Sequence, residues 1–294
     1  MKVISIALYY IFYAKVWLLA WLPFPVLYGI SDVLAFFTYH VVRYRRKVVR
    51  KNLCNSFPEK SEKELIAIEK KFYAHLLDIF VESLKLLHIS EKEIQRRMVF
   101  TNIEEMNRLF GRQKNIIGLL GHYGNWEWIT SIQLYFPEVI IGEIYRPLKN
   151  RYFDRFFLKL RGRFGTLNIP KNDALRTTVR LRQEGKVFGL GFIADQTPSS
   201  ANLHYWNTFL HQDTPFLNGP ERIARKGEYA VVYFDIQKTK RGYYTCEVIP
   251  MTENGKETRE NEITDKYVEL FEKTICREPA YWLWTHKRWK HVRI

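Results

Sequence analysis

Apolar residues recur at helical spacing over residues 61–88. They lie three or four positions apart for most of this stretch, and they are Leu65, Ile68, Phe72, Leu76, Ile79, Phe80, Leu84 and Leu87. Ser61 followed by Glu64 is the capping-box pattern that begins a helix. The pattern therefore predicts a long amphipathic helix, and Thr101 with Glu104 predicts a second, short helix.

Beyond residue 114, short apolar runs alternate with amphipathic runs. Strands are predicted at 115–120, 139–145, 166–169, 187–194, 229–236 and 243–249. Helices are predicted at 126–136, 150–164, 173–183, 220–225 and 263–276. This alternation is typical of an α/β protein with a mixed, largely parallel central sheet flanked by helices, and the last two strands are candidates for an antiparallel pair. Since no repeat or flexible linker interrupts residues 43–294, we predict one domain there.

The N-terminal residues 3–30 are almost continuously apolar and aromatic. A span of about 20 apolar residues crosses a bilayer, so residues 3–22 are a candidate transmembrane helix. Lys15 lies inside that span and leaves two alternatives open, an amphipathic helix in the membrane interface and a buried helix of a soluble protein. Bulky side chains near position 22 argue against a cleaved signal peptide. We predict that residues 1–42 form membrane-anchoring or interfacial helices.

A basic cluster follows this apolar region. Residues 43–51 contain six basic residues and no acid, in a chain whose net charge is +15. Such a cluster beside a membrane segment attracts anionic head groups, and the positive-inside rule places the following domain in the cytoplasm. The competing interpretation is a solvated basic face of a helix.

The segment 121–127, with the sequence GHYGNWE, places His122 and Glu127 five residues apart. It lies between the predicted strand 115–120 and the predicted helix 126–136. On one continuous helix, residues five apart point about 140° away from each other. A tight turn, which Gly121 and Gly124 permit, is therefore what allows the two side chains to act together.

A histidine with a carboxylate is suited to general-base chemistry. A neutral imidazole accepts a proton near neutral pH, and a carboxylate fixes its tautomer. Because no serine or cysteine accompanies the pair in this segment, we hypothesise that His122 deprotonates a substrate hydroxyl in acyl transfer. Glu127 would orient the imidazole, and backbone N–H groups at the next helix would stabilise an oxyanion. The alternative is a turn-capping histidine and an exposed first-turn acid.

Three other signals carry less weight. Residues 189–194 fit the outline G-x-G-x-x-A, but no helix follows the second glycine, so no dinucleotide cofactor is expected. Residues 226–234 are similar to an RNA-binding strand, but Glu228 stands where an aromatic residue belongs, so nucleic acid is not an expected partner. The histidines and the three widely separated cysteines lack metal-ligand spacing, so no metal is expected.

Several separate segments together carry a family resemblance. They are residues 52–58 (NLCNSFP), 121–127 (GHYGNWE), 145–150 (YRPLKN), 194–196 (ADQ), 218–220 (NGP) and 281–290 (YWLWTHKRWK). On these the chain resembles the bacterial lipid A biosynthesis acyltransferases, within the wider group of H-x4-D/E glycerolipid acyltransferases. The resemblance covers nearly the whole chain. The order and spacing of the segments are more specific than H-x4-E alone.

The resemblance implies a glycerolipid-acyltransferase-like fold at the cytoplasmic face of the bacterial inner membrane. The implied reaction transfers a fatty acyl chain from acyl carrier protein, or from acyl-CoA, to a hydroxyl of an anionic lipid acceptor such as a lipid A precursor. It implies that His122 and Glu127 are the catalytic dyad. It also implies that Arg146 contacts a phosphate or oxyanion, that Asp195 organises the site through Arg146 or a substrate hydroxyl, and that Asn125 binds substrate or the oxyanion.

Two positions depart from the family pattern and leave the acceptor open. Leu210 stands where a glycine is expected, and Glu221 where a small residue is usual. Related enzymes acylate other lipids, so an amino-acid lipid or a lysophospholipid is an alternative acceptor. Two further hypotheses belong to other classes, a non-catalytic basic protein that binds anionic lipid or nucleic acid at a membrane surface, and a hydrolase that uses water in the same site.

Overall fold

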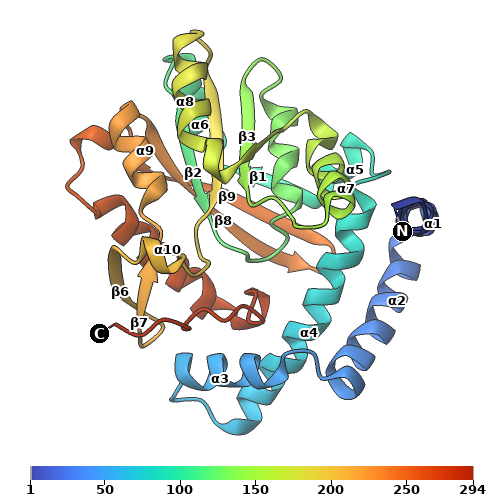
Figure 1. Cartoon of the computed structure of the whole chain (residues 1–294). Coiled ribbons are helices and arrows are strands. Elements are labelled where there is room, and N and C mark those ends of the chain that lie inside the picture. The colour runs from blue at the N-terminus through green and yellow to red at the C-terminus, as the bar shows by residue number, and fades with distance from the viewer. Residues whose placement is uncertain (1, 294) are drawn as a thin grey trace.

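A seven-stranded sheet forms the centre of the molecule (Figure 1). The structure is a computed structural model, and it describes the backbone of residues 2–293 and the side chains of residues 9–293. The strand order is β1-β9-β8-β2-β5-β3-β4, and every neighbouring pair is parallel except β8 and β9. The predicted mixed, largely parallel sheet flanked by helices, with an antiparallel pair among its last strands, is confirmed.

The strands of the sheet are β1 (Met98–Thr101), β2 (Ile116–Leu120), β3 (Ile140–Tyr145), β4 (Leu167–Pro170), β5 (Phe188–Ile193), β8 (Ala230–Lys240) and β9 (Tyr243–Thr252). The helices are α1 (Lys2–Trp21), α2 (Phe24–Phe36), α3 (Arg46–Ser56), α4 (Glu62–Lys85), α5 (Glu91–Arg97), α6 (Glu104–Gly111), α7 (Arg151–Arg161), α8 (Ala174–Gln183), α9 (Gly219–Gly227) and α10 (Glu262–Arg277). Every predicted strand and helix is present within a few residues, although 126–136 is a 3₁₀ helix, Trp128–Tyr135.

Pattern analysis missed the four-residue strand β1 and a separate antiparallel hairpin, β6 (Tyr205–Phe209) and β7 (Gln212–Phe216). The turn of this hairpin holds Leu210 at φ 50° and His211 at φ 63°. A two-residue hairpin turn with both φ angles positive favours glycine. This geometry explains why a glycine is expected at 210, and the Leu210 side chain compensates by being fully buried.

The predicted capping box is present at the start of α4. The Glu64 carboxylate accepts from the Ser61 N–H at 2.8 Å, and the Ser61 hydroxyl accepts from the Glu64 N–H at 3.4 Å. These bonds satisfy donors that a helix start leaves free. The glutamate at the second departing position, Glu221, is also structural, because its buried carboxylate accepts from the backbone N–H groups of Asn261 and Thr264 at the start of α10.

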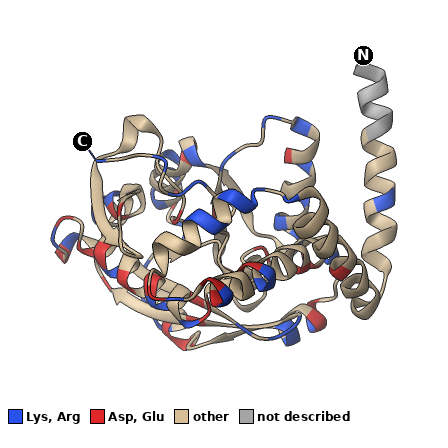
Figure 2. Cartoon of the chain, turned by 90° about the horizontal axis from the view of Figure 1, so that it is seen from below, with Lys and Arg blue, Asp and Glu red and all other residues tan. Residues whose placement is uncertain are grey.

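Two apolar helices precede the domain. They separate at Pro23, and α2 continues as a π-helical segment, Phe37–Val42. Among the described residues, the helix long and apolar enough to cross a membrane is Phe24–Val42. The candidate span at residues 3–22 coincides with α1, but its first side chains lie outside the described residues. Figure 2 shows α1 extending to one side of the domain, with few charged residues along it.

One side of α2 packs against α4. The hydroxyls of Ser31 and Tyr28 donate to Asp78 and Glu82 of α4, both at 2.9 Å. The other side exposes large apolar side chains, which include Val26, Val33, Leu34 and Phe36. The division at residue 42 into anchor and domain stays a prediction.

Candidate active site

His122 and Asp195 meet at the carboxyl ends of two neighbouring strands. Strands β2 and β5 are parallel, and their register pairs Leu120 with Ile193. Each of the two polar residues lies two positions beyond its strand. The loops therefore leave the same edge of the sheet together, as at the ligand-binding edge of open α/β sheets. The His122 Nδ1 lies 2.7 Å from Asp195 Oδ1.

The Asp195 carboxylate is buried and fully engaged. Its second oxygen, Oδ2, accepts a hydrogen bond from the indole Nε1 of Trp282 at 2.8 Å. Burial alone raises the pKa of Asp195, but the charge of His122 and the hydrogen bonds from His122 and Trp282 outweigh it and lower the pKa to about 2. An ionised Asp195 accepts from Nδ1–H, and this assigns the unprotonated nitrogen of the neutral ring to Nε2.

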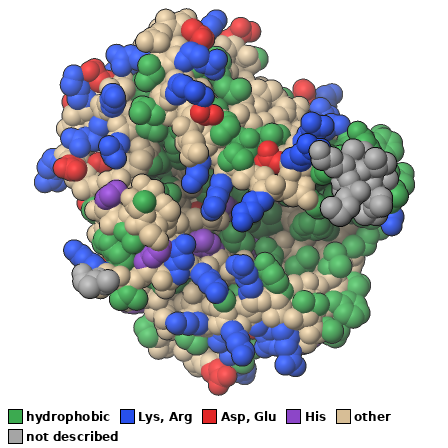
Figure 3. All heavy atoms as spheres, viewed as in Figure 1, with side chains coloured by type: hydrophobic (Ala, Val, Ile, Leu, Met, Phe, Trp, Pro, Cys, Tyr) green, Lys and Arg blue, Asp and Glu red, His purple; other side chains and the backbone are tan. Residues whose placement is uncertain are grey.

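The other side of the imidazole is partly exposed. The His122 side chain is 19% exposed, and its Nε2 lies 3.3 Å from the amide nitrogen of Gln196. The ring of Trp126 lies edge-on to the imidazole, with 5.3 Å between the ring centroids. In Figure 3, histidine, basic and apolar side chains gather around a hollow in this face of the molecule.

A C-terminal segment fixes the turn that carries His122. The Leu283 N–H donates to the His122 carbonyl, and the Gly124 N–H donates to the Tyr281 carbonyl, both at 3.1 Å. Gly124 has φ 59°, the left-handed conformation that glycine adopts readily. The family resemblance included this C-terminal segment, but pattern analysis did not foresee that Trp282 contacts Asp195.

Glu127 makes no hydrogen bond to His122 in the structure, so its predicted role as the orienting partner stays a prediction. Its carboxylate pairs with both sides of the Arg161 guanidinium, at 2.8 Å from Nε and 2.7 Å from Nη2. The Trp126 indole adds a third bond at 3.2 Å. Burial raises the pKa of Glu127, but Arg161 outweighs it and holds the pKa below the ordinary value. Glu127 pairs with Arg161 because α7 ends with this arginine beside the Glu127 carboxylate. His122 pairs with Asp195 because the loop after β5 brings this carboxylate to the imidazole.

Arg161 faces a second carboxylate that was not predicted. The Glu143 side chain lies 3.5 Å from Arg161 Nε, and burial raises the pKa of Glu143 to about 7. Arg161 is 21% exposed and pairs with Glu127, the last residue of the predicted site segment. An acid in the middle of the apolar run 139–145 was the available signal for Glu143. A basic residue near the end of a predicted helix is too common to have singled out Arg161.

The structure gives no support to the predicted role of Asn125 at the substrate or oxyanion. Its side chain is fully buried, its Nδ2 donates to Glu82 at 2.7 Å, and its Oδ1 accepts from the Trp128 N–H at 3.1 Å. Both polar ends are therefore used to tie the turn to α4 and to begin the 3₁₀ helix. The position serves the geometry of the turn.

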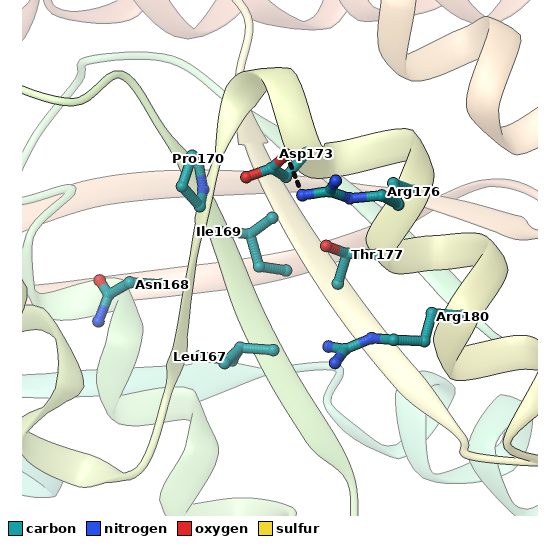
Figure 4. Close-up of a pocket in the computed structure, with 8 residues that line it drawn as sticks. All are labelled: Leu167, Asn168, Ile169, Pro170, Asp173, Arg176, Thr177 and Arg180. Atoms are coloured by element: carbon teal, nitrogen blue, oxygen red, sulfur yellow. Dashed lines mark hydrogen bonds and ion pairs between the residues drawn. The ribbon is translucent and has the colours of Figure 1, made fainter.

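Arg146 is exposed and makes no hydrogen bond or ion pair with the described residues. The expected contact between Arg146 and Asp195 is absent because the Asp195 oxygens are occupied by His122 and Trp282. A separate hollow of about 350 Å³ lies between β4 and α8 (Figure 4). An Asp173–Arg176 ion pair of 2.7 Å crosses its rim. None of the predicted site residues lines this hollow.

Comparisons with known proteins agree with the predicted resemblance. The model of the family described as bacterial lipid A biosynthesis acyltransferase matches residues 1–291. The chain is 22% identical over 275 residues to the lipid A biosynthesis palmitoleoyltransferase of Escherichia coli (strain K12), covering 93% of this chain and 88% of that protein. It is 24% identical over 277 residues to the lauroyltransferase of the same organism, with the same coverage. A lipid A biosynthesis acyltransferase of Haemophilus influenzae is 22% identical over 235 residues, which is 79% of this chain and 72% of that protein. The chain belongs to the bacterial lipid A biosynthesis acyltransferase family.

Proposed function

We propose that the protein transfers a fatty acyl chain from an acyl thioester to a hydroxyl of a lipid A precursor or a related anionic lipid. The observation that carries this proposal is the His122–Asp195 hydrogen bond of 2.7 Å, which leaves the other imidazole nitrogen, Nε2, on the partly exposed side of the ring beside the Gln196 amide. Membership of the family supports the reaction class. The acceptor hydroxyl acts as the nucleophile.

In the proposed reaction, His122 Nε2 takes the proton of the acceptor hydroxyl as its oxygen attacks the thioester carbonyl carbon. Asp195 stabilises the imidazolium that forms. The tetrahedral intermediate then collapses, the carbon–sulfur bond breaks, and the leaving thiolate takes the proton back from Nε2. The products are an ester and a free thiol. His122 is regenerated in its starting tautomer.

The Glu127–Arg161 pair has a different proposed role. Two hydrogen bonds to Glu127 fix the guanidinium plane of Arg161 beside the site. A guanidinium held in this way suits an acceptor phosphate or the developing oxyanion. We therefore assign anion contact to Arg161 rather than to Asn125. Arg146 remains free to meet acceptor phosphates at the rim.

The proposed donor is acyl carrier protein, with acyl-CoA as the alternative. Acyl carrier protein and lipid A phosphates are both acidic, and a chain with a net charge of +15 attracts either one. The apolar helix Phe24–Val42 followed by the basic residues 43–51 supports attachment to the inner membrane with the domain on its cytoplasmic face. No cofactor takes part in the proposed reaction.

The test is acyl transfer by purified protein from a labelled acyl thioester to a lipid A precursor. His122→Ala should lower the rate by on the order of 10²–10⁴-fold, because it removes the base. His204→Ala is the matched control, since His204 is an exposed loop histidine. Transfer near the wild-type rate in folded His122→Ala would sink the mechanism. Labelled free fatty acid in place of lipid ester would instead support the hydrolase hypothesis.

A further inference from the structure

The exposed surface of residues 146–159 combines apolar and basic side chains. Leu148 is 46% exposed and Phe153 is 41% exposed. The exposed basic residues around them are Arg146, Lys149, Arg151, Arg155 and Lys159, and the same stretch holds one acid, Asp154. We call this surface the α7 patch. Apolar side chains ringed by lysine and arginine are typical of helices that lie in a membrane interface.

Aromatic contacts join the α7 patch directly to the N-terminal apolar helix. The ring of Tyr9 stacks on Tyr152 with 5.0 Å between centroids, and the rings of Phe12 and Phe153 lie 5.2 Å apart. The Lys159 ammonium donates to the Tyr13 hydroxyl at 2.6 Å. Figure 1 shows α7 and α1 on the same side of the sheet. Any medium that surrounds α1 therefore also meets the α7 patch.

Over the residues whose side chains are described, the outward side of α1 is apolar apart from Lys15. Tyr10, Ile11, Leu18 and Trp21 are each more than half exposed. Through the Phe12–Phe153 contact, the apolar surface of α1 adjoins the α7 patch. A single exposed apolar residue needs no explanation, but a continuous apolar surface with a basic rim marks an interaction site.

We propose that the α7 patch lies in the head-group region of an anionic bilayer as a second membrane contact beside α1 and α2. The inference rests on the membrane association put forward above. Two observations select a lipid surface as the occupant, the continuity with the apolar N-terminal helices and the excess of five basic residues over one acid. Leu148 and Phe153 enter the interface, and the basic side chains meet lipid phosphates.

This contact brings the membrane close to the proposed chemistry. Helix α7 ends at Arg161, the partner of Glu127. Phe153 and Arg161 are eight residues apart on that helix, which is about 12 Å at 1.5 Å per residue. The acceptor lipid thus meets the cation of the site from the membrane side, without leaving the bilayer.

The test uses nitroxide labels on single cysteines in the full chain. The exposed cysteines Cys54 and Cys276 are first changed to serine, and Cys246 is kept because it is buried. Labels at Phe153→Cys, Ile11→Cys and Leu175→Cys are then compared in vesicles of phosphatidylethanolamine and phosphatidylglycerol. Leu175 is the matched control, because it is 45% exposed on α8 and lies outside the α7 patch.

We expect the Phe153→Cys label to gain access to dissolved oxygen and lose access to a water-soluble nickel chelate when vesicles are added, while the Leu175→Cys label keeps aqueous values. Lipid values at Ile11→Cys with aqueous values at Phe153→Cys would overturn the inference and leave membrane association intact. Aqueous values at both Ile11→Cys and Phe153→Cys would overturn the α7 patch contact and the membrane association of α1. The proposed acyl transfer would still be tested separately, by the activity of the purified protein. If acyl carrier protein without vesicles protected the Phe153→Cys label from the nickel chelate, this would also overturn the inference and would identify the α7 patch as a protein docking surface.

A second pair of variants gives a functional readout. Leu148→Glu/Phe153→Glu should slow transfer to an acceptor embedded in vesicles by about tenfold, because two charges enter the apolar part of the patch. The same variant should act normally on acceptor dispersed in detergent. Leu175→Glu/Val179→Glu, at equally exposed positions of α8, should leave both rates unchanged. Equal losses in the two double variants would contradict the proposal.

Discussion

The hydrogen bond from His122 to Asp195 decides which imidazole nitrogen is available for chemistry. Asp195 accepts from Nδ1–H and is itself held by Trp282, so Nε2 carries the lone pair, on the partly exposed side of the ring beside the Gln196 amide. Glu127 has no such contact and instead neutralises Arg161. The two carboxylates therefore contribute different things, the first to proton transfer and the second to the position of a cation.

Replacing each carboxylate by its amide separates these contributions. Asp195→Asn offers a donor where Nδ1–H needs an acceptor, so the tautomer reverses and kcat should fall on the order of 10³-fold or more. Glu127→Gln should lower the free energy of unfolding by about 2 kcal/mol through the weakened bonds to Arg161, with a smaller loss in kcat. Rates and denaturant unfolding of both variants check this. The reverse ranking of the two kcat values would restore Glu127 as the orienting residue.

Both His122 and Asp195 were identifiable from sequence, but their contact was not. Glu127 was chosen as partner because it lies five residues from His122, whereas Asp195 lies 73 residues away. The correct pairing depends on β2 and β5 being neighbours in the sheet, and a pattern of apolar residues does not give strand order. The contact of Asn125 could not be predicted for the same reason, since its partner Glu82 belongs to a distant helix.

Among the elements, β2, β3, β5 and α7 bring the site together, and the apolar periodicity was sufficient to predict all four. The strand β1 was missed because it is only four residues long, and the hairpin of β6 and β7 was missed because its strands carry little alternation. The helix predicted at 126–136 is a 3₁₀ helix since Asn125, Thr130 and Ser131 each bond to backbone three residues away. Hydroxyl and amide side chains compete with the backbone in this way.

Glu143 on β3 gives the protein a measurable pH dependence. Burial raises its folded pKa from an ordinary 4.5 to about 7, so the folded state holds this proton more tightly than the unfolded state. The stabilising contribution is complete below about pH 4.5 and is lost as the pH rises through about 7. The unfolding midpoint of wild type should therefore fall more between pH 5 and 8 than that of Glu143→Gln, measured in detergent. Parallel curves for the two proteins would contradict the assignment.

The hairpin turn at Leu210 sets two effects against each other. Glycine would relieve about 1–2 kcal/mol of left-handed backbone strain. It would also remove a fully buried leucine side chain, a loss of about 2–5 kcal/mol. The loss is the larger effect, so Leu210→Gly should lower the free energy of unfolding by about 2 kcal/mol. A more stable Leu210→Gly protein, in the same denaturant titration, would show that strain dominates at this turn.

For the whole molecule, the structure divides the basic cluster at residues 43–51 into two groups. Arg46 and Arg50 bind Glu69 of α4, and Arg45 donates to the Thr285 carbonyl, so these three hold the fold together. Arg43, Lys47 and Lys51 are exposed and make no ion pair with the described residues. Only the second group is free to meet a charged membrane.

Charge reversal of the two lysines in that free group tests the membrane role without disturbing α4. Lys47→Glu/Lys51→Glu should weaken partition into anionic vesicles, by about 1 kcal/mol for each lysine removed, and the effect should shrink at high salt. Flotation with anionic and neutral vesicles measures it. Lys186→Glu, at an exposed loop position before β5, is the control. Equal partition of all three proteins would contradict electrostatic attachment through the basic cluster.

The central claim is that His122 makes this chain an acyltransferase for a membrane lipid, and the lipids of the living cell test it most directly. Mass spectrometry would compare the lipids of three strains, in which the only copy of the gene encodes the wild-type protein, His122→Ala or the control His204→Ala. The account predicts that His122→Ala cells lack one acyl chain on one lipid class, expected to be lipid A, and that the two other strains carry it. Identical lipid profiles in the wild-type and His122→Ala cells, with the variant protein folded and present in the membrane, would contradict the claim.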